Sequence, residues 1–232
     1  ALREDLASQG KRLLFATNGG IYSKSYTPLG LYIENGRRYY RLNRGKGGGN
    51  FFLRPNGVFY ITDRGAAVVD TRDYRPKHKV LQAIQSGPLL VKNGKLHPRF
   101  IESSSSLYIR NGVGIDREGR VVFAISDMPV NFHDFATLFR DRLDAPNALY
   151  LDGSISAMYA PGLNRYGGWG FHSYTSIIAL IADEEFAGRL EFRMEVTEIL
   201  PLQRAARGAV FRVEIQDEFF DFELDEGEGF IT

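Results

Sequence analysis

Short apolar stretches separated by turn residues run through most of the chain and predict a protein built mainly of β-strands. Asn-Gly dipeptides, which are typical of tight hairpins, separate short apolar stretches at Asn35-Gly36 and Asn93-Gly94. Residues 116–119 lie between two further apolar stretches in the same way. Pro55-Asn56-Gly57 predicts another hairpin, between strands at 51–53 and 58–61. We therefore expect largely antiparallel or mixed sheets.

Helical periodicity is confined to two places. Residues 1–9 carry leucines on one face and are followed by Gly10, a residue type that commonly ends helices. Residues 131–143 have apolar side chains at helical spacing, and Asn131 stands where it can cap the first turn. With its flanking apolar stretches this segment forms a strand, helix, strand unit over 121–151. These elements predict an α+β fold with a β-rich mixed sheet core and few helices.

Charge divides the chain unevenly. Residues 183–232 hold 14 acidic and 5 basic side chains, whereas residues 1–182 hold 24 basic and 14 acidic ones. Apolar alternation at 210–224 predicts two or three strands within the acidic tail. No repeat or long linker separates the tail from the rest, so we expect a single domain over residues 1–232.

Composition excludes several classes of chemistry. Mean hydropathy is -0.24 and no apolar run approaches the ~18 residues of a membrane helix, so we expect no membrane span. The chain has no cysteine, which excludes thiol catalysis, thiolate zinc sites and iron–sulfur clusters. Its histidines are dispersed, without the H-x-x-x-H spacing of a helical zinc site. We predict neither a metal nor a cofactor.

A glycine-rich segment at 45–50 resembles phosphate-binding loops at first sight. Position 40 is tyrosine and no Ser or Thr follows Lys46, so the P-loop spacing fails, and we predict a flexible loop beside an active site. Basic residues crowd the same region: Arg37, Arg38, Arg41, Arg44, Lys46 and Arg54. Such a surface favours an anionic ligand, and it is also typical of a solvated hairpin face balanced by the acidic tail. Without a recognised module or a strongly basic domain, we expect no nucleic-acid partner.

Three apolar strands end in small and polar residues, at 13–20, 85–88 and 149–156. Such strand ends are places where backbone amides and short polar side chains converge on a ligand. In order along the chain stand F-A-T-N-G-G, G-G-G-N-F-F, Q-S-G-P-L-L-V, I-R-N-G-V-G-I-D and A-L-Y-L-D-G-S-I-S. This series, over about residues 13–182, resembles the phosphodiester glycosidase family, whose members release a sugar from a phosphodiester.

The resemblance implies a fold like that of the family and a set of site residues. Asp152 would act as the nucleophile or as the base for water, Arg110 would hold the phosphate, and Asp127 would be a second carboxylate if an acid is needed. Residues predicted to bind the substrate are Asn18, Gly19, Gly20, Gln85, Ser86, Gly153, Ser154, Ser156 and His172. His172 is included because it lies beside a cluster of glycines and the tryptophan, which could face a sugar.

Two departures from the family pattern refine these expectations. Many members have L-D-G-G-G-S where residues 151–156 are L-D-G-S-I-S, which suggests a bacterial branch of the family. Members also usually have strands ahead of the position equivalent to residue 1, and the acidic tail, 182–232, could supply them in a permuted order. The expected substrate is a phosphorylated carbohydrate, a glycosyl-1-phosphodiester of a cell-envelope or other glycan, which implies an extracytoplasmic location. The alternative is a carbohydrate- or phosphoglycan-binding module without catalysis, and the oligomeric state stays open.

Overall fold

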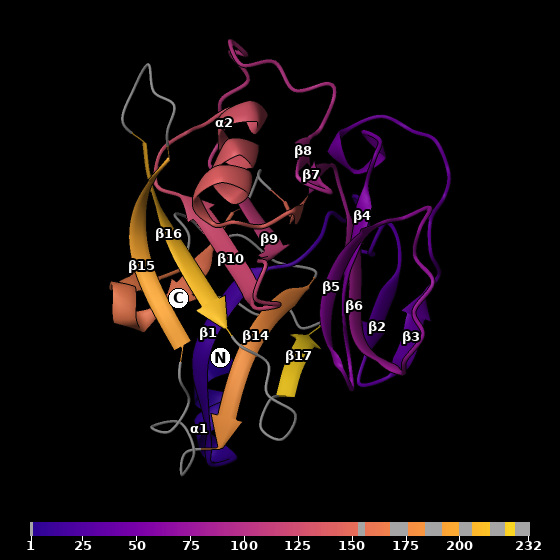
Figure 1. The fold of residues 1–232 in the computed structure, drawn as a ribbon. Helices are drawn as coiled ribbons and strands as arrows, with labels where there is room; N and C mark the ends of the chain where they lie inside the picture. The colour runs from indigo at the N-terminus through magenta and orange to yellow at the C-terminus, as the bar shows by residue number, and fades with distance from the viewer. Residues whose placement is uncertain are drawn as a thin grey trace.

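The computed structural model describes residues 2–152, 156–167, 176–183, 192–199, 206–213 and 221–225, and its strands form three antiparallel sheets (Figure 1). The first sheet has the order β13-β12-β1-β14-β17. Its strands are β1 (Lys11–Asn18), β12 (Met158–Ala160), β13 (Arg165–Tyr166), β14 (Ile177–Asp183) and β17 (Asp221–Asp225). Helix α1 (Leu2–Ser8) leads into β1, and Gly10 follows it at φ 72° as expected of a helix stop.

The second sheet has the most strands of the three, in the order β15-β16-β10-β9-β11-β7-β8. Its strands are β7 (Leu89–Lys92), β8 (Lys95–Leu96), β9 (Asn111–Ile115), β10 (Val121–Ser126), β11 (Asn147–Tyr150), β15 (Phe192–Ile199) and β16 (Ala206–Val213). The third sheet, on the right in Figure 1, has the order β3-β2-β6-β4-β5. Its strands are β2 (Tyr32–Glu34), β3 (Arg37–Tyr40), β4 (Gly57–Thr62), β5 (Gly65–Asp70) and β6 (Val80–Ser86).

Three phenylalanines join the sheets at the centre of the core. The ring of Phe123 on β10 lies 4.9 Å from that of Phe15 on β1 and 6.0 Å from that of Phe59 on β4. All three side chains are buried. Because each ring comes from a different sheet, this contact fixes the sheets relative to one another through apolar burial and ring packing.

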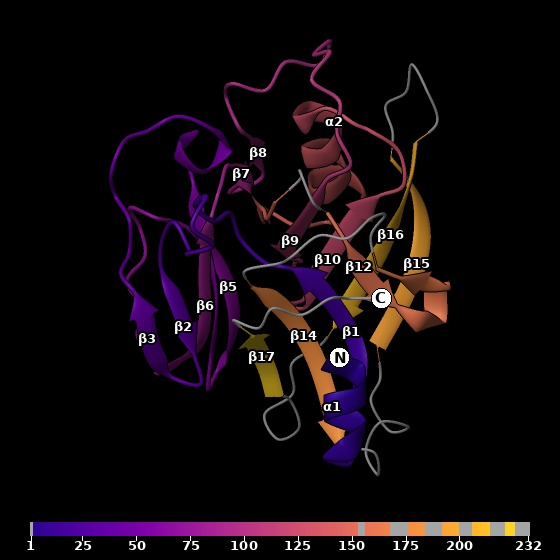
Figure 2. The same ribbon diagram turned by 180° about the vertical axis from the view of Figure 1, so that it is seen from behind.

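Helix α2 (Phe132–Thr137) covers the face of the second sheet that points away from Phe123 (Figure 2). Asn131 caps it as predicted, accepting a hydrogen bond from the Asp134 amide at 2.8 Å. Strands β10 and β11 flank β9 and both run antiparallel to it, so β10, α2 and β11 form a crossover between parallel strands. A Cβ added to Gly114 would lie 2.9 Å from the Phe139 ring, so glycine lets the helical layer pack directly on the strand.

The α+β fold class with a β-rich core and few helices is confirmed. The Asn35-Gly36 and Asn93-Gly94 hairpins are also confirmed, since all four residues have the positive φ angles that such turns require. In the described part of the tail, β15 and β16 extend the second sheet, and β17 joins the first sheet beside β14. The single domain and the permuted order of the tail stay predictions. No helix in the described ranges is long and apolar enough to cross a membrane.

One local prediction is wrong, and a second is confirmed with a change of helix type. Instead of the predicted strand at 51–53, Asn50–Phe52 form a 3-10 helix, η1, because Phe51 turns into the core and Asn56 Nδ2 closes the turn on the Phe51 carbonyl at 2.8 Å. The predicted helix at 131–143 is α-helical only to Thr137. Residues Leu138–Arg142 continue it as a wider π-type turn, η2, in which the Leu143 amide donates to the Leu138 carbonyl at 3.0 Å. A short 3-10 helix, η3 (Pro161–Leu163), links β12 to β13.

A buried carboxylate at the end of β5 connects the third sheet to the second. Asp70 accepts hydrogen bonds from Arg72 Nη2 at 2.7 Å and from Lys92 Nζ of β7 at 2.8 Å. Burial by itself would raise the pKa of Asp70, but the hydrogen bonds from Arg72 and Lys92 outweigh it and lower the pKa to about 2. The folded protein therefore binds this proton more weakly than the unfolded chain does.

This difference predicts a pH-dependent stability. Because the folded pKa is the lower one, Asp70 adds about 2 kcal/mol above pH ~4, and this contribution is lost as the pH falls from about 4 to about 2. We expect Asp70→Asn to reduce the free energy of unfolding by about that amount at neutral pH, with a difference that shrinks in acid. Urea unfolding at several pH values measures it. Asp73→Asn, at a carboxylate that is 62% exposed, is the control; an Asp70→Asn effect that does not vary with pH would contradict the prediction.

Candidate functional site

The backbone of Leu151 and Asp152, just after β11, is hydrogen-bonded to all three sheets. From the end of β6, Ser86 Oγ donates to the Leu151 carbonyl at 2.7 Å. From the end of β1, Asn18 Nδ2 donates to the Asp152 carbonyl at 3.1 Å. The Asp152 amide donates to Oδ1 of Asn111, the first residue of β9, at 3.1 Å. Three strand ends from three sheets thus meet at one aspartate.

The side chains around this aspartate bond to one another as well. Asn111 Nδ2 lies 2.8 Å from Asn18 Oδ1 and 3.0 Å from Thr17 Oγ1. Ser156 Oγ donates to the Asp152 carbonyl at 2.9 Å. We call Thr17, Asn18, Ser86, Asn111 and Ser156 the Asp152 network. All but Ser156 are buried, whereas Asp152 is half-buried, so buried polar groups fix the main chain of Asp152 at a partly exposed position.

Arg110 lies on the opposite face of the strand from Asn111. Its guanidinium carbon is 3.7 Å from the centre of the Phe132 ring, and its Nε donates to the Val130 carbonyl at 2.8 Å. The side chain is buried, and burial lowers the pKa of Arg110 while a hydrogen bond with Tyr150 acts against this. Guanidinium groups nevertheless remain charged in proteins.

No carboxylate in the described ranges forms an ion pair with Arg110. Its positive charge is balanced instead by carbonyl dipoles and aromatic faces. A buried charge without a counter-ion is costly, so an anion is the ligand chemistry that this environment fits.

Strand register brings Arg110 and Asp152 together. Strands β9 and β11 pair Gly112 with Tyr150, and the Leu151 amide continues the ladder with a bond to the Asn111 carbonyl at 3.2 Å. Arg110 comes just before β9 and Asp152 just after β11, so both residues lie at the same end of this antiparallel pair. The candidate carboxylate and the buried arginine therefore belong to the same end of the second sheet.

Gly19, Gly20 and Gln85 are occupied with internal contacts. The Gly19 amide donates to the Ser176 carbonyl at 2.8 Å, and a Cβ added to Gly20 would lie 2.9 Å from the Gln85 carbonyl. The Gln85 side chain binds the backbone of Asn43 through both its amide nitrogen and its oxygen. These residues pack the first and third sheets closely beside the Asp152 network, and their predicted contact with substrate stays a prediction.

Asp127 follows β10 and forms an ion pair with Arg165 of β13. It is no member of the Asp152 network, and its role as a second carboxylate stays a prediction. The predicted binding residues Gly153, Ser154 and His172 lie outside the described residues. In the described part of the chain, no three side chains of the metal-binding types gather closely enough to hold an ion.

Comparison with known proteins assigns the chain to a family. Residues 11–178 match the family model described as phosphodiester glycosidase. The chain belongs to the phosphodiester glycosidase family. It is also 46% identical over 162 residues to "Uncharacterized protein YigE" of Escherichia coli (strain K12), a match over 70% of this chain and 63% of that protein. The chain thus spans less than two thirds of the length of this relative.

A solved structure also resembles the chain, that of the zebrafish N-acetylglucosamine-1-phosphodiester alpha-N-acetylglucosaminidase catalytic domain, auto-inhibited by its pro-peptide. The likeness has a TM-score of 0.47 and 18% sequence identity, and it covers 88% of this chain and 64% of that one.

The sequence did not single out Thr17 and Asn111 as site residues of this family member. Both stand within the motifs that indicated the family, at the end of β1 and the start of β9. Each is a polar residue next to apolar strand positions, which was the signal available in the sequence. Both are buried in the structure, and a buried polar side chain needs hydrogen-bond partners.

Proposed function

We propose that the protein is a hydrolase that cleaves the bond between a sugar and the phosphate of a glycosyl-1-phosphodiester. The observation that carries the proposal is the convergence of three strand ends on the backbone at Leu151 and Asp152, at the same end of the β9–β11 pair as the buried Arg110. Family membership supports the class of reaction. A glycan of the cell envelope, reached outside the cytoplasm, is the substrate we propose.

Asp152 and Arg110 have complementary roles in the proposed reaction. As the bond between the anomeric carbon and the phosphate oxygen breaks, positive charge develops on the sugar, and the Asp152 carboxylate stabilises it by attack or by activating water. The phosphate monoester leaves with the bonding electrons, and Arg110 stabilises the charge that grows on it. Water supplies the new hydroxyl of the sugar. A phosphate monoester is already a stable anion, so the reaction needs no strong general acid.

Sugar release from a panel of sugar-1-phosphodiesters tests the proposal. The unmodified protein is expected to liberate equal amounts of free sugar and phosphate monoester. Arg110→Lys keeps the positive charge but not the planar pair of donors, so we expect kcat/KM to fall by about 10- to 100-fold. Arg117→Lys is the matched control, at an exposed arginine paired with Asp144.

The alternative is a binding module without catalysis. Saturable binding of the panel compounds by the unmodified protein, with no sugar released from any of them, would support that module and overturn the hydrolase. Equal activity of Arg110→Lys and Arg117→Lys would remove Arg110 from the mechanism.

A further inference from the structure

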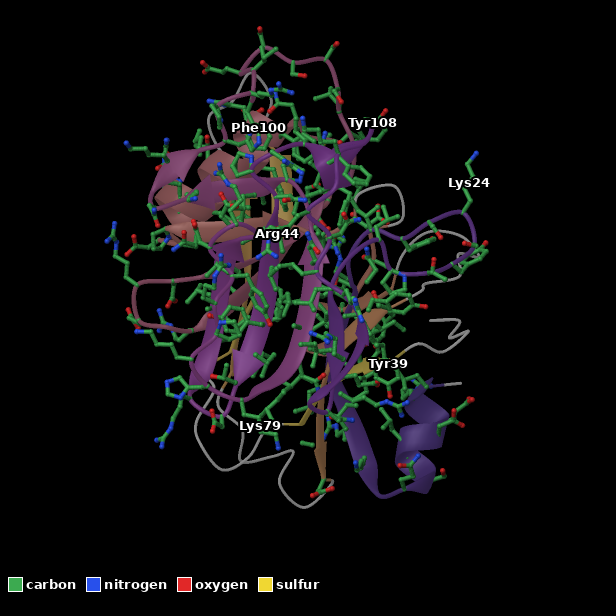
Figure 3. The ribbon with its side chains drawn as sticks, turned by 90° about the vertical axis from the view of Figure 1, so that its right-hand side faces the viewer. Lys24, Tyr39, Arg44, Lys79, Phe100 and Tyr108 are labelled. Carbon is green, nitrogen blue, oxygen red and sulfur yellow. The ribbon has the colours of Figure 1, made fainter. Side chains whose placement is uncertain are left out.

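A second group of positive charges lies on the segment that precedes β4. Arg41, Arg44, Lys46 and Arg54, which we call the basic segment, all have exposed side chains. None of them forms an ion pair with a described residue. Figure 3 shows Arg44 on the face of the molecule that also carries Tyr108, two residues before Arg110. These cations therefore face solvent without a counter-ion from this part of the chain.

The backbone of this segment is held in place. Gln85 binds Asn43 through its amide nitrogen at 2.7 Å and its oxygen at 2.8 Å, and the Asn43 side chain accepts from the Gly45 amide at 2.8 Å. The Arg54 guanidinium donates to the carbonyls of Arg44, at 2.6 Å, and of Gly45. The charges are thus carried by a shaped loop, which lowers the entropic cost of binding a ligand.

The same contacts place the basic segment beside the candidate active site. Gln85, which holds Asn43, is followed by Ser86, which donates to the Leu151 carbonyl next to Asp152. At the other end of the segment, the Leu89 amide of β7 donates to the Pro55 carbonyl at 2.8 Å. Two side-chain hydrogen bonds from the neighbouring residues Gln85 and Ser86 therefore link the backbone of the basic segment and the backbone next to Asp152.

We propose that the basic segment binds further phosphate groups of a polymeric substrate, so that the protein acts on a polymer of sugar phosphates. This inference rests on the proposed function and names its substrate class. One buried guanidinium, Arg110, suits the phosphate at the bond that breaks, whereas several exposed cations suit neighbouring phosphates that stay hydrated. Each added ion pair is weak alone, but several on one chain act together.

A glycan fits the basic segment better than a nucleic acid does. Single-stranded nucleic acids bind through exposed aromatic side chains on which bases stack. Within residues 41–54 the aromatic side chains are Phe51 and Phe52, which pack against each other with ring centres 4.9 Å apart. Phe51 is buried, and Gly47 lies directly against Phe52, since a Cβ there would be 2.6 Å from its ring. The basic segment itself therefore offers no fully exposed ring on which bases could stack.

The test compares an oligomer of sugar-1-phosphate units with the matching single-unit phosphodiester. The test variant is the triple substitution Arg41→Gln, Arg44→Gln and Lys46→Gln, which spares Arg54 because that side chain holds the loop. The control is Arg64→Gln, Lys77→Gln and Lys79→Gln. These residues have the same total charge and are exposed, and Lys79 immediately precedes the opposite end of β6 from Ser86. Figure 3 shows Lys79 well separated from Arg44.

The expected result is a preference of the unmodified protein for the oligomer that weakens when ionic strength rises from about 0.05 M to about 0.5 M. In the test variant the ratio of kcat/KM for oligomer over single unit is expected to fall by about tenfold, which corresponds to about 1.4 kcal/mol, while the control keeps the ratio of the unmodified protein. Affinity for the labelled oligomer, measured by fluorescence anisotropy, is expected to change in parallel.

Three outcomes would overturn the inference. These are an unchanged ratio in the test variant, an equal fall in the control, and binding of a single-stranded DNA of equal charge as tight as that of the oligomer. Failure of the proposed function would look different, because the unmodified protein would then release no sugar from either substrate. The binding measurement does not depend on turnover and separates the two failures.

Discussion

Replacement of Asp152 by asparagine is expected to lower kcat for sugar release by about a thousandfold. Asparagine has nearly the same shape as aspartate, and the contacts of Asp152 with Asn18, Asn111 and Ser156 are made by its main chain. These contacts are kept in the variant. The change therefore removes the negative charge that stabilises the sugar in the transition state and leaves the surrounding backbone in place.

Initial-rate measurements on the best substrate of the phosphodiester panel, with thermal unfolding as the check on folding, determine this effect. Asp144→Asn is the control, since Asp144 is 64% exposed and pairs with Arg117; it is expected to retain full activity. If Asp152→Asn unfolds at the parental temperature and keeps more than about a tenth of the parental rate, Asp152 is not the essential carboxylate.

Replacement of Asn111 by alanine is expected to reduce the free energy of unfolding by about 3 kcal/mol. The side chain is buried, and its two polar atoms lie within hydrogen-bond distance of Thr17, Asn18, Asp152 and Ser156. Alanine would leave several of these groups buried with fewer partners, in a place where water has little access. The same change would loosen the Asp152 amide, so sugar release should fall as well.

Denaturant unfolding of Asn111→Ala and of Asn131→Ala compares the stability lost with the Asp152 network and the stability lost with a single helix-capping asparagine. Asn131 is also buried, but it caps α2 and binds the Glu102 carbonyl. Loss of such a cap costs about 1 kcal/mol. A cost for Asn111→Ala no greater than that for Asn131→Ala would show that the Asp152 network contributes little to stability.

The tight turns could be predicted from the sequence because the residue types within each turn decide its backbone angles. Asparagine and glycine tolerate the positive φ angles of tight turns, and the structure has such turns at Asn35-Gly36 and Asn93-Gly94. The predicted strand at 51–53 is absent, and the predicted helix at 131–143 changes its type part-way, at places where side chains are buried. At 51–53 the core takes up Phe51 and turns the chain, and after Thr137 the helix widens into η2, whose Leu138 and Phe139 are buried.

The candidate site could be predicted only in part. Motif resemblance indicated Asp152, Arg110, Asn18, Ser86 and Ser156. In the structure Asn18 and Ser156 bond to the Asp152 carbonyl, and Ser86 bonds to the Leu151 carbonyl beside it. The resemblance did not indicate which of these residues form hydrogen bonds with one another. Ser86 supports the Leu151 carbonyl, a contact across 65 positions of the chain, and no pattern within a single segment specifies such a partner.

By itself, the sequence determined the fold class, the main turns, the absence of thiol chemistry and the motifs of a phosphodiester glycosidase. Each of these depends on residue type and on spacing along one segment. Only the tertiary structure decided that Asn111 is the centre of the Asp152 network, that Arg110 is a buried cation, and that the basic segment lies beside them. The physical reason is that hydrogen bonds and charges act over a few ångströms in space, and the pairing of strands from three sheets sets those distances.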